Sequence, residues 1–156
     1  MNEDELAWAY LSRVVEPPSR ELGLLVASRG PVEAADRVKR GEVTEELARA
    51  TEARRELDCA ADDLDALARL GGRLLTPADT EWPLLAFTSF GGVPRERASG
   101  HAPLVLWVVG ADSLVDVTER ACSIVGTRAS TSYGERMAAD LGAGLAERDV
   151  AIVSGG

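Results

Sequence analysis

The sequence is poor in the residue types on which metal sites and hydrolytic triads depend. Its 156 residues include 2 cysteines and 1 histidine. Cys59 and Cys122 show no Cys-x-x-Cys or Cys/His spacing, so we interpret both as small hydrophobic side chains. The single histidine, His101, leaves almost no material for a histidine-based metal site or a Ser/His triad. We therefore predict no metal and no cofactor.

Long apolar runs are also missing. No stretch reaches the roughly 18 apolar residues of a membrane-spanning helix, so we expect no contact with a membrane. The first five residues, Met-Asn-Glu-Asp-Glu, are acidic where a signal peptide would be basic. The apolar fraction of 46% is ordinary for a globular protein. These features predict a cytoplasmic location.

No segment of the chain is basic. The net charge is −9, with 10 basic and 16 acidic residues in 1–70, 2 and 3 in 71–96, and 5 and 7 in 97–156. A broad positive face, which is typical of general nucleic-acid binders, is therefore excluded. If DNA binds, we expect a local site that uses few phosphates and backbone groups.

The first 70 residues show apolar residues at helical spacing. The helix boundary signals, in chain order, are a Pro17-Pro18 stop, a Ser19 cap, a Gly30-Pro31 start, a Gly41 stop and a Thr44 cap. The last helix is expected to be long, with an apolar stripe from Leu47 to Leu67 that ends at Gly71. We predict a small helical domain over residues 1–70.

From residue 71 onward, short apolar runs bounded by turn residues predict strands. They cover residues 73–76, 104–109, 121–125 and 150–153, and the last three are predicted to be buried. Residues 88–103 are rich in Gly, Pro and Ser and predict a loop, and residues 111–120 a helical turn.

A helix is expected over residues 134–148, with Met137, Leu141 and Leu145 on one face and a capping box of Ser132 and Glu135. Strand, helix and strand with short links form a βαβ unit with parallel strands. We expect an α/β fold with a parallel sheet of about three strands. Such a sheet leaves edges unpaired and one face uncovered, so we expect the chain to be part of a longer protein.

The loop after residue 125 has the composition of an anion site. Gly126 allows close approach of a ligand, Arg128 offers a planar charged fork for a phosphate, and Tyr133 a ring on which a base can stack. Hydroxyl groups come from Thr127, Ser130, Thr131 and Ser132. The following helix contributes free N–H groups and the positive end of its dipole.

This loop matches neither G-x-G-x-x-G nor the P-loop pattern, so a dinucleotide site and a P-loop are not supported. Alternatively, Thr131 and Ser132 only cap the helix and Arg128 is a solvated charge. A second loop begins at Ser154-Gly155-Gly156, beside the first at the same sheet edge, or is an ordinary turn.

These segments resemble a known family. Ile124-Val125-Gly126-Thr127-Arg128, Tyr133-Gly134 and the run from Val150 to Gly156 resemble the opening of the Rossmann-like domain of DprA/Smf DNA-processing proteins. Residues 80–85 (Thr-Glu-Trp-Pro-Leu-Leu) and 103–110 resemble further segments of that family. Residues 13–18 and 30–35 resemble the helical, SAM-like N-terminal domain of its actinobacterial members.

The resemblance implies a fold and a function. The fold is an incomplete Rossmann-like parallel sheet over residues 71–156, preceded by a helical SAM-like domain over residues 1–70. The function is single-stranded DNA binding in natural transformation and DNA recombination, with RecA recombinase as a partner, a homodimer when full length, and no enzymatic activity. The resemblance assigns the DNA phosphate to Gly126, Thr127 and Arg128, and a pocket to Ser130, Tyr133, Ser154, Gly155 and Gly156.

The chain departs from the family pattern in lacking the Gly-Ile-Asp continuation and the later basic residues, and the family's dimer and RecA surfaces belong largely to that later part. Two other hypotheses stay open. One is a nucleotide-processing enzyme of the related LOG-type fold, because a loop that binds the phosphate of DNA can equally bind the phosphate of a nucleotide. The other is a protein-interaction module formed by residues 1–70, because their acidic excess suits a protein partner better than DNA.

Overall fold

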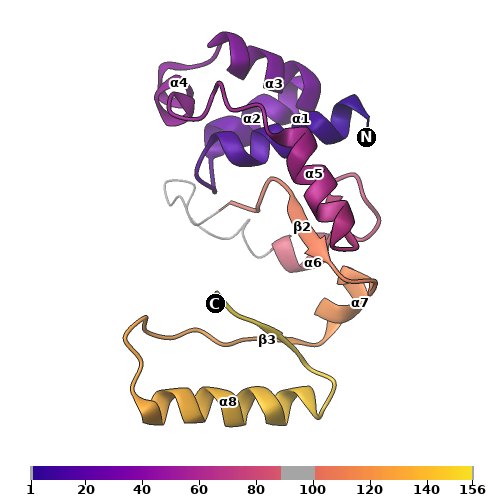
Figure 1. Cartoon of the computed structure of the whole chain (residues 1–156), viewed down its shortest axis with the longest axis vertical. Coiled ribbons are helices and arrows are strands. Elements are labelled where there is room, and N and C mark those ends of the chain that lie inside the picture. Colours follow the sequence, from indigo (N-terminus) through magenta and orange to yellow (C-terminus); the bar gives the residue numbers. More distant parts are fainter. Residues whose placement is uncertain (1, 89–100, 156) are drawn as a thin grey trace. The chain divides into compact units, whose positions relative to one another are not determined.

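The computed structural model describes residues 2–88 and 101–155, and it divides into two compact units, Met1–Ala111 and Asp112–Gly156. Its mixture of helices with short parallel and antiparallel strands is an α/β fold, as the sequence predicts (Figure 1). The Rossmann-like and SAM-like assignments stay predictions. Across the described ranges, the chain has no helix both long and apolar enough to cross a membrane.

Helices dominate the first unit. They are α1 (Glu3–Val14), α2 (Arg20–Arg29), α3 (Pro31–Arg40), α4 (Glu45–Thr51), α5 (Ala60–Arg69) and the short α6 (Leu84–Phe87). The predicted boundary signals are confirmed: the hydroxyls of Ser19 and Thr44 cap α2 and α4. Pro31 starts α3, and Gly41 ends it with a left-handed φ of 72°.

The prediction of one long fourth helix is wrong. Turns separate α4 from α5 between residues 52 and 59. A continuous apolar stripe needs an apolar side chain one turn after Thr51, but residues 54 and 55 are both arginine. The Thr51 hydroxyl instead donates to the carbonyl of Leu47 at 2.8 Å inside the core, and the chain turns away after it.

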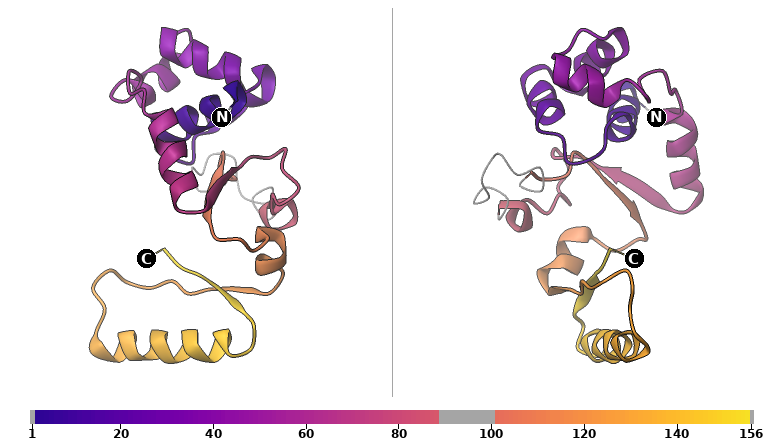
Figure 2. Two further views of the ribbon diagram at one scale, coloured as in Figure 1. Left: turned by 45° about the vertical axis from the view of Figure 1, so that its right-hand side comes forward. Right: turned by 90° about the vertical axis from the view of Figure 1, so that its left-hand side faces the viewer.

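The core of this unit lies between its helices, which gather into one bundle (Figure 2). Its most deeply buried side chains include Leu11 and Val14 of α1, Val38 of α3 and Thr51 of α4. The neighbours of α1 include α3 and α5, so that α1 organises the bundle. Burial of apolar surface at this interface supplies most of the stability of these short helices.

A two-stranded sheet completes the first unit. Strand β1 (Gly72–Leu75) pairs antiparallel with β2 (Leu106–Val109). The expectation that residues 104–109 join a parallel sheet as a buried strand is therefore wrong. Burial alternates along β2 and leaves Trp107 and Val109 exposed, because an antiparallel pair can keep one face in solvent.

The first unit extends past the predicted domain boundary at residue 70. Strand β1 follows α5 after Gly71 and packs on it, and its pairing with β2 carries the unit to Ala111. Gly72 permits this close approach, since a Cβ there would lie 2.4 Å from Leu67 Cδ1 and 2.6 Å from the carbonyl oxygen of Val108. Of the loop predicted over residues 88–103, residues 89–100 lie outside the described residues.

The second unit contains α7 (Leu114–Glu119), β3 (Ala121–Ser123), α8 (Ser132–Ala146) and β4 (Ala151–Val153). Strands β3 and β4 are parallel, so the predicted βαβ unit is confirmed. Helix α8 runs along this pair (Figure 1), and the Cβ position of Gly142 lies 3.8 Å from Ile152 Cδ1. The predicted three-stranded sheet is wrong, because β2 pairs in the first unit.

The strands of this βαβ unit are not buried as predicted. Ile152 and Val153 of β4 are exposed, and Cys122 of β3 is half-buried. Among the described residues of the second unit, no side chain is buried. Within this unit, α8 is the one long helix in the described residues, and a single helix leaves much of a two-stranded sheet open.

Candidate functional site

The two predicted loops start from the same edge of the β3–β4 sheet. Ala121 pairs with Ala151 and Ser123 with Val153, so both strands end together. The N–H of Ile124 then donates to the carbonyl oxygen of Val153 at 2.9 Å, which extends the pairing by one bond. The segment from Gly126 and the segment from Ser154 therefore leave the sheet side by side, at the carboxyl ends of parallel strands, where ligands bind in open α/β sheets.

The loop between β3 and α8 is held by its own hydroxyl groups. Thr127 Oγ1 accepts a hydrogen bond from the N–H of Ala129 at 3.2 Å, which folds the loop into a local turn. Thr131 is the N-cap of α8, and its Oγ1 accepts from the N–H of Gly134 at 3.2 Å. One of the two hypotheses for Thr131, a helix cap, is thereby confirmed.

The predicted capping box of Ser132 and Glu135 is wrong, because the helix begins one residue earlier than that box requires. With Thr131 as N-cap, the box position falls on Gly134, which has no side chain. Glu135 instead accepts a hydrogen bond from Ser130 Oγ, 2.8 Å from its Oε1. The sequence signal, an acid in the first helical turn, identified Glu135 as a cap residue and missed its contact with the loop.

Two glycines of the predicted site have no structural reason to be glycine. Neither Gly126 nor Gly155 has a φ in the left-handed region. A Cβ at either position would meet no heavy atom of the described chain within 4 Å. Backbone is thus open to solvent at both strand ends, which is the geometry that a closely approaching ligand uses.

Arg128 and Tyr133 are both exposed, and Tyr133 keeps 73% of its surface accessible. No described residue forms an ion pair or hydrogen bond with the Arg128 guanidinium. The N–H groups of Ser132 and Tyr133, in the first turn of α8, likewise have no partner in the part of the chain that the structure describes. These are donors that an anion can use.

The predicted site residues thus come together only in part. Gly126, Thr127, Arg128 and Ser130 lie on one loop, with Tyr133 at the start of the helix that follows it. Ser154 and Gly155 follow the neighbouring strand. Gly156 lies outside the described residues. In residues 2–88 and 101–155, no group of three or more His, Cys, Asp or Glu side chains could hold a metal ion.

A cavity of about 820 Å³ lies in the first unit and includes none of the predicted site residues. Its lining is mostly apolar, with Trp8, Val15 and Pro18 among the contributors. Among the described residues that line it, His101 and Arg20 are ionisable. The candidate anion site, by contrast, is an open surface of the second unit.

Comparisons with known proteins cover all of the predicted site residues. The family described as DNA recombination-mediator protein A matches residues 73–156. Two curated proteins of Mycobacterium tuberculosis, from strains CDC 1551/Oshkosh and H37Rv, carry provisional names as DNA processing protein DprA. Each is 64% identical to this chain over 151 residues.

The match covers 96% of this chain but 39% of each relative, so the chain spans well under half the length of these curated proteins. No solved structure matches the chain. The candidate loop, both strands beside it and helix α8 all fall within the matched residues.

Proposed function

The chain belongs to the DNA recombination-mediator protein A family, and from this premise we propose that it binds single-stranded DNA through a phosphate site formed by Gly126, Thr127 and Arg128. The relatives' names associate the family with DNA processing and recombination. The phosphate is the group of DNA that a short loop with one arginine can hold without any broad positive surface.

The observation that carries the proposal is the pair of glycines at the ends of β3 and β4. The fold of the described chain requires no glycine at 126 or 155, because neither packing nor φ forbids a side chain there. A ligand that contacts the backbone at positions 126 and 155 would explain why both residues are glycine. The proposed pocket around the phosphate consists of Ser130, Tyr133, Ser154, Gly155 and Gly156.

Arg128 supplies the charge in this proposal. Its guanidinium forms no ion pair with a carboxylate of the described residues, so it is available to a phosphate. Thr127 Oγ1 accepts from Ala129, which leaves its own O–H free to donate to a phosphate oxygen. Tyr133, exposed at the start of α8, offers a ring for base stacking, which favours a single strand with unpaired bases.

The partners follow from the family and belong to the same proposal. In the longer relatives, we propose RecA recombinase as a partner in DNA recombination and natural transformation, a homodimer as the assembly, and the cytoplasm as the location. The chain would act by binding and not by catalysis, in keeping with the description of the family as a recombination mediator.

The test is Arg128→Ala in the full chain, with binding of fluorescein-labelled oligothymidylate followed by fluorescence anisotropy over a series of salt concentrations. Loss of one charged phosphate contact should weaken binding roughly 10-fold or more at low salt. The slope of log affinity against log salt should fall by about 0.7, because one counterion fewer is released from a single strand.

Arg49→Ala is the matched control. Arg49 is also exposed, but it pairs with Glu45 on α4 of the first unit. Its loss should leave both the affinity and the salt slope as in the wild type. If Arg128→Ala binds as the wild type does at every salt concentration, the phosphate assignment is wrong.

A further inference from the structure

The hydrogen bond between Ser130 and Glu135 ties the candidate loop to the first turn of α8. Ser130 Oγ lies 2.8 Å from Glu135 Oε1, and both residues are otherwise exposed. Ser130 immediately precedes the N-cap Thr131, so this bond closes the end of the loop onto the helix. A carboxylate is thereby held beside a loop that is proposed to bind an anion.

Glu135 also interacts with the start of α8. It is the acidic residue of the first turn of α8, where a negative charge interacts favourably with the helix dipole. Ser130 follows Arg128 by two residues, so their Cα atoms are at most about 7.6 Å apart. Through the Ser130 side chain and this hydrogen bond, the Glu135 carboxylate lies at most roughly 13 Å from the Arg128 Cα. That distance is well inside the Debye length of about 30 Å at 0.01 M salt, so the charge acts on an anion bound at the loop in low-salt buffer.

Resting on the proposed function, we propose that Glu135, positioned by Ser130, is a specificity-determining residue that favours the singly charged phosphodiester of a DNA strand over the doubly charged phosphate of a free nucleotide. Repulsion by a fixed carboxylate grows in proportion to the charge of the ligand. A terminal phosphate, with a second pKa of about 6, carries nearly two charges at neutral pH. A phosphodiester carries one.

This role separates a DNA-strand binder from a nucleotide enzyme on the same loop. Arg128 alone attracts the doubly charged phosphate more strongly than the phosphodiester. The Glu135 carboxylate, held by Ser130 on the same loop, opposes that preference through its charge. Glu135 thus selects against mononucleotides.

The experiment compares two small probes that carry the same base. Thymidine 5′-monophosphate has a doubly charged phosphate, and thymidylyl-(3′→5′)-thymidine has one phosphodiester. Each is titrated into the full chain while the backbone amide resonances of Gly126, Thr127 and Arg128 are followed by NMR. Glu135→Gln keeps an acceptor for the Ser130 hydroxyl and removes the charge.

Glu135→Gln should tighten the phosphodiester about two- to threefold and the monophosphate by roughly the square of that factor. Ser130→Ala, which keeps the charge but releases its tether, should lose part of the discrimination. Asp140→Asn on the same helix removes an exposed charge farther along α8 and should leave the affinity ratio unchanged.

Equal changes for the two probes, or none, in Glu135→Gln would overturn the role of Glu135 if Arg128→Ala still removes the amide shifts. Amide shifts that persist in Arg128→Ala would overturn the phosphate site itself. A change in the ratio that Asp140→Asn reproduces would show a general charge effect and would also reject the proposal.

Discussion

The two units of this chain differ in how many of their apolar side chains are buried. The buried hydrophobic residues of the described chain all lie between Ala7 and Val105, in the first unit. The second unit leaves even its strand residues Ile152 and Val153 exposed. A helical bundle with its own core is thus joined in sequence to a βαβ unit that presents most of its surface to solvent.

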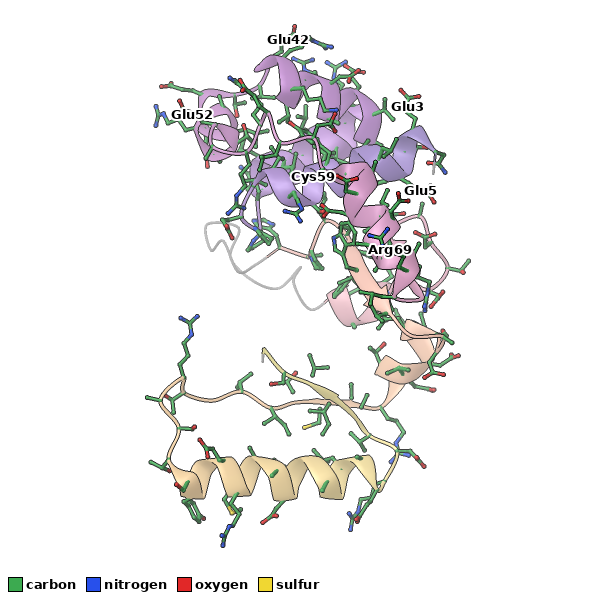
Figure 3. All side chains as sticks on the ribbon, in the orientation of Figure 1. Glu3, Glu5, Glu42, Glu52, Cys59 and Arg69 are labelled. Atoms are coloured by element: carbon green, nitrogen blue, oxygen red, sulfur yellow. The ribbon has the colours of Figure 1, made fainter. Side chains whose placement is uncertain are left out.

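Charge follows the same division. Except for Arg55 and Arg69, the described arginines of the first unit each form an ion pair. The arginines of the second unit form none with any described residue; they are Arg120, Arg128, Arg136 and Arg148. Figure 3 shows carboxylates of the first unit, such as Glu3, Glu42 and Glu52, on the outside of the bundle.

This difference indicates which unit can gain new interactions from a bound anion. The first unit pairs most of its described arginines with carboxylates and keeps an acidic exterior, which repels nucleic acid. The second unit holds arginines that form no ion pair with a described residue, among them Arg128 without any hydrogen bond, so binding of an anion can improve their interactions. An acidic protein can therefore contain an anion site, provided that the site is confined to the unit whose arginines form no ion pairs.

The largest effect is expected when one leucine is truncated to alanine in each unit. Leu11 in α1 is fully buried, so Leu11→Ala should lower the free energy of unfolding of the first unit by about 2–5 kcal/mol. Leu141 of α8 is 51% exposed, and Leu141→Ala should cost less than about 1 kcal/mol. Urea unfolding followed by circular dichroism and by NMR of each unit separates the two effects.

An equal cost at both positions would contradict the comparison. It would mean that α8 buries Leu141 in solution as deeply as the bundle buries Leu11. A cost at Leu11 below about 1 kcal/mol would instead remove the bundle core as the main source of stability.

Local signals in the sequence were enough to place most elements. The caps at Ser19 and Thr44, the Pro31 start and the Gly41 stop each act within a few residues, and the structure has all four. The loop with Gly126, Thr127 and Arg128 was likewise found from its position between a strand pattern and a helix pattern. These signals need no knowledge of distant parts of the chain.

Pairing between distant segments was not predictable in the same way. The run over residues 104–109 is apolar enough for a buried parallel strand, yet it pairs antiparallel with Gly72–Leu75. Nothing local to that run specifies its partner. The Ser130–Glu135 contact was not predicted either. The N-cap lies at Thr131, one residue before the predicted position, and this shift changes which side chains meet.

A buried hydroxyl in the first unit should make the stability of that unit depend on pH above 10. Tyr10 Oη donates to the carbonyl oxygen of Arg55 at 2.8 Å, and burial raises the pKa of Tyr10 to about 12 from its ordinary value of 10.0. The folded state therefore holds the proton more tightly than the unfolded state. This contribution to stability is complete below pH 10 and is lost as the pH rises from 10 to about 12.

Tyr10→Phe should remove that part of the pH dependence, and it should cost about 0.5–1.5 kcal/mol at neutral pH through the lost hydrogen bond. Tyr133→Phe in the exposed turn of α8 is the matched control and should change neither quantity. Urea unfolding at a series of pH values measures both. If the Tyr10→Phe protein loses stability above pH 10 as steeply as the wild type, the titration of other groups governs that range.

The smallest expected effect concerns the paired arginines. Arg13 contacts Asp63 through two of its nitrogens, and the hydrogen bond with Asp63 raises the pKa of Arg13. A double-mutant cycle of Arg13→Ala and Asp63→Ala should give a coupling of about 0.2–1 kcal/mol, because Arg13 is half exposed.

Arg128→Ala should leave the free energy of unfolding within about 0.5 kcal/mol of the wild type, since no described residue depends on it. If Arg128 instead stabilises the fold as much as Arg13 does, its charge already has a partner inside the chain. The division between satisfied and free arginines would then fail at the one residue on which the phosphate site depends.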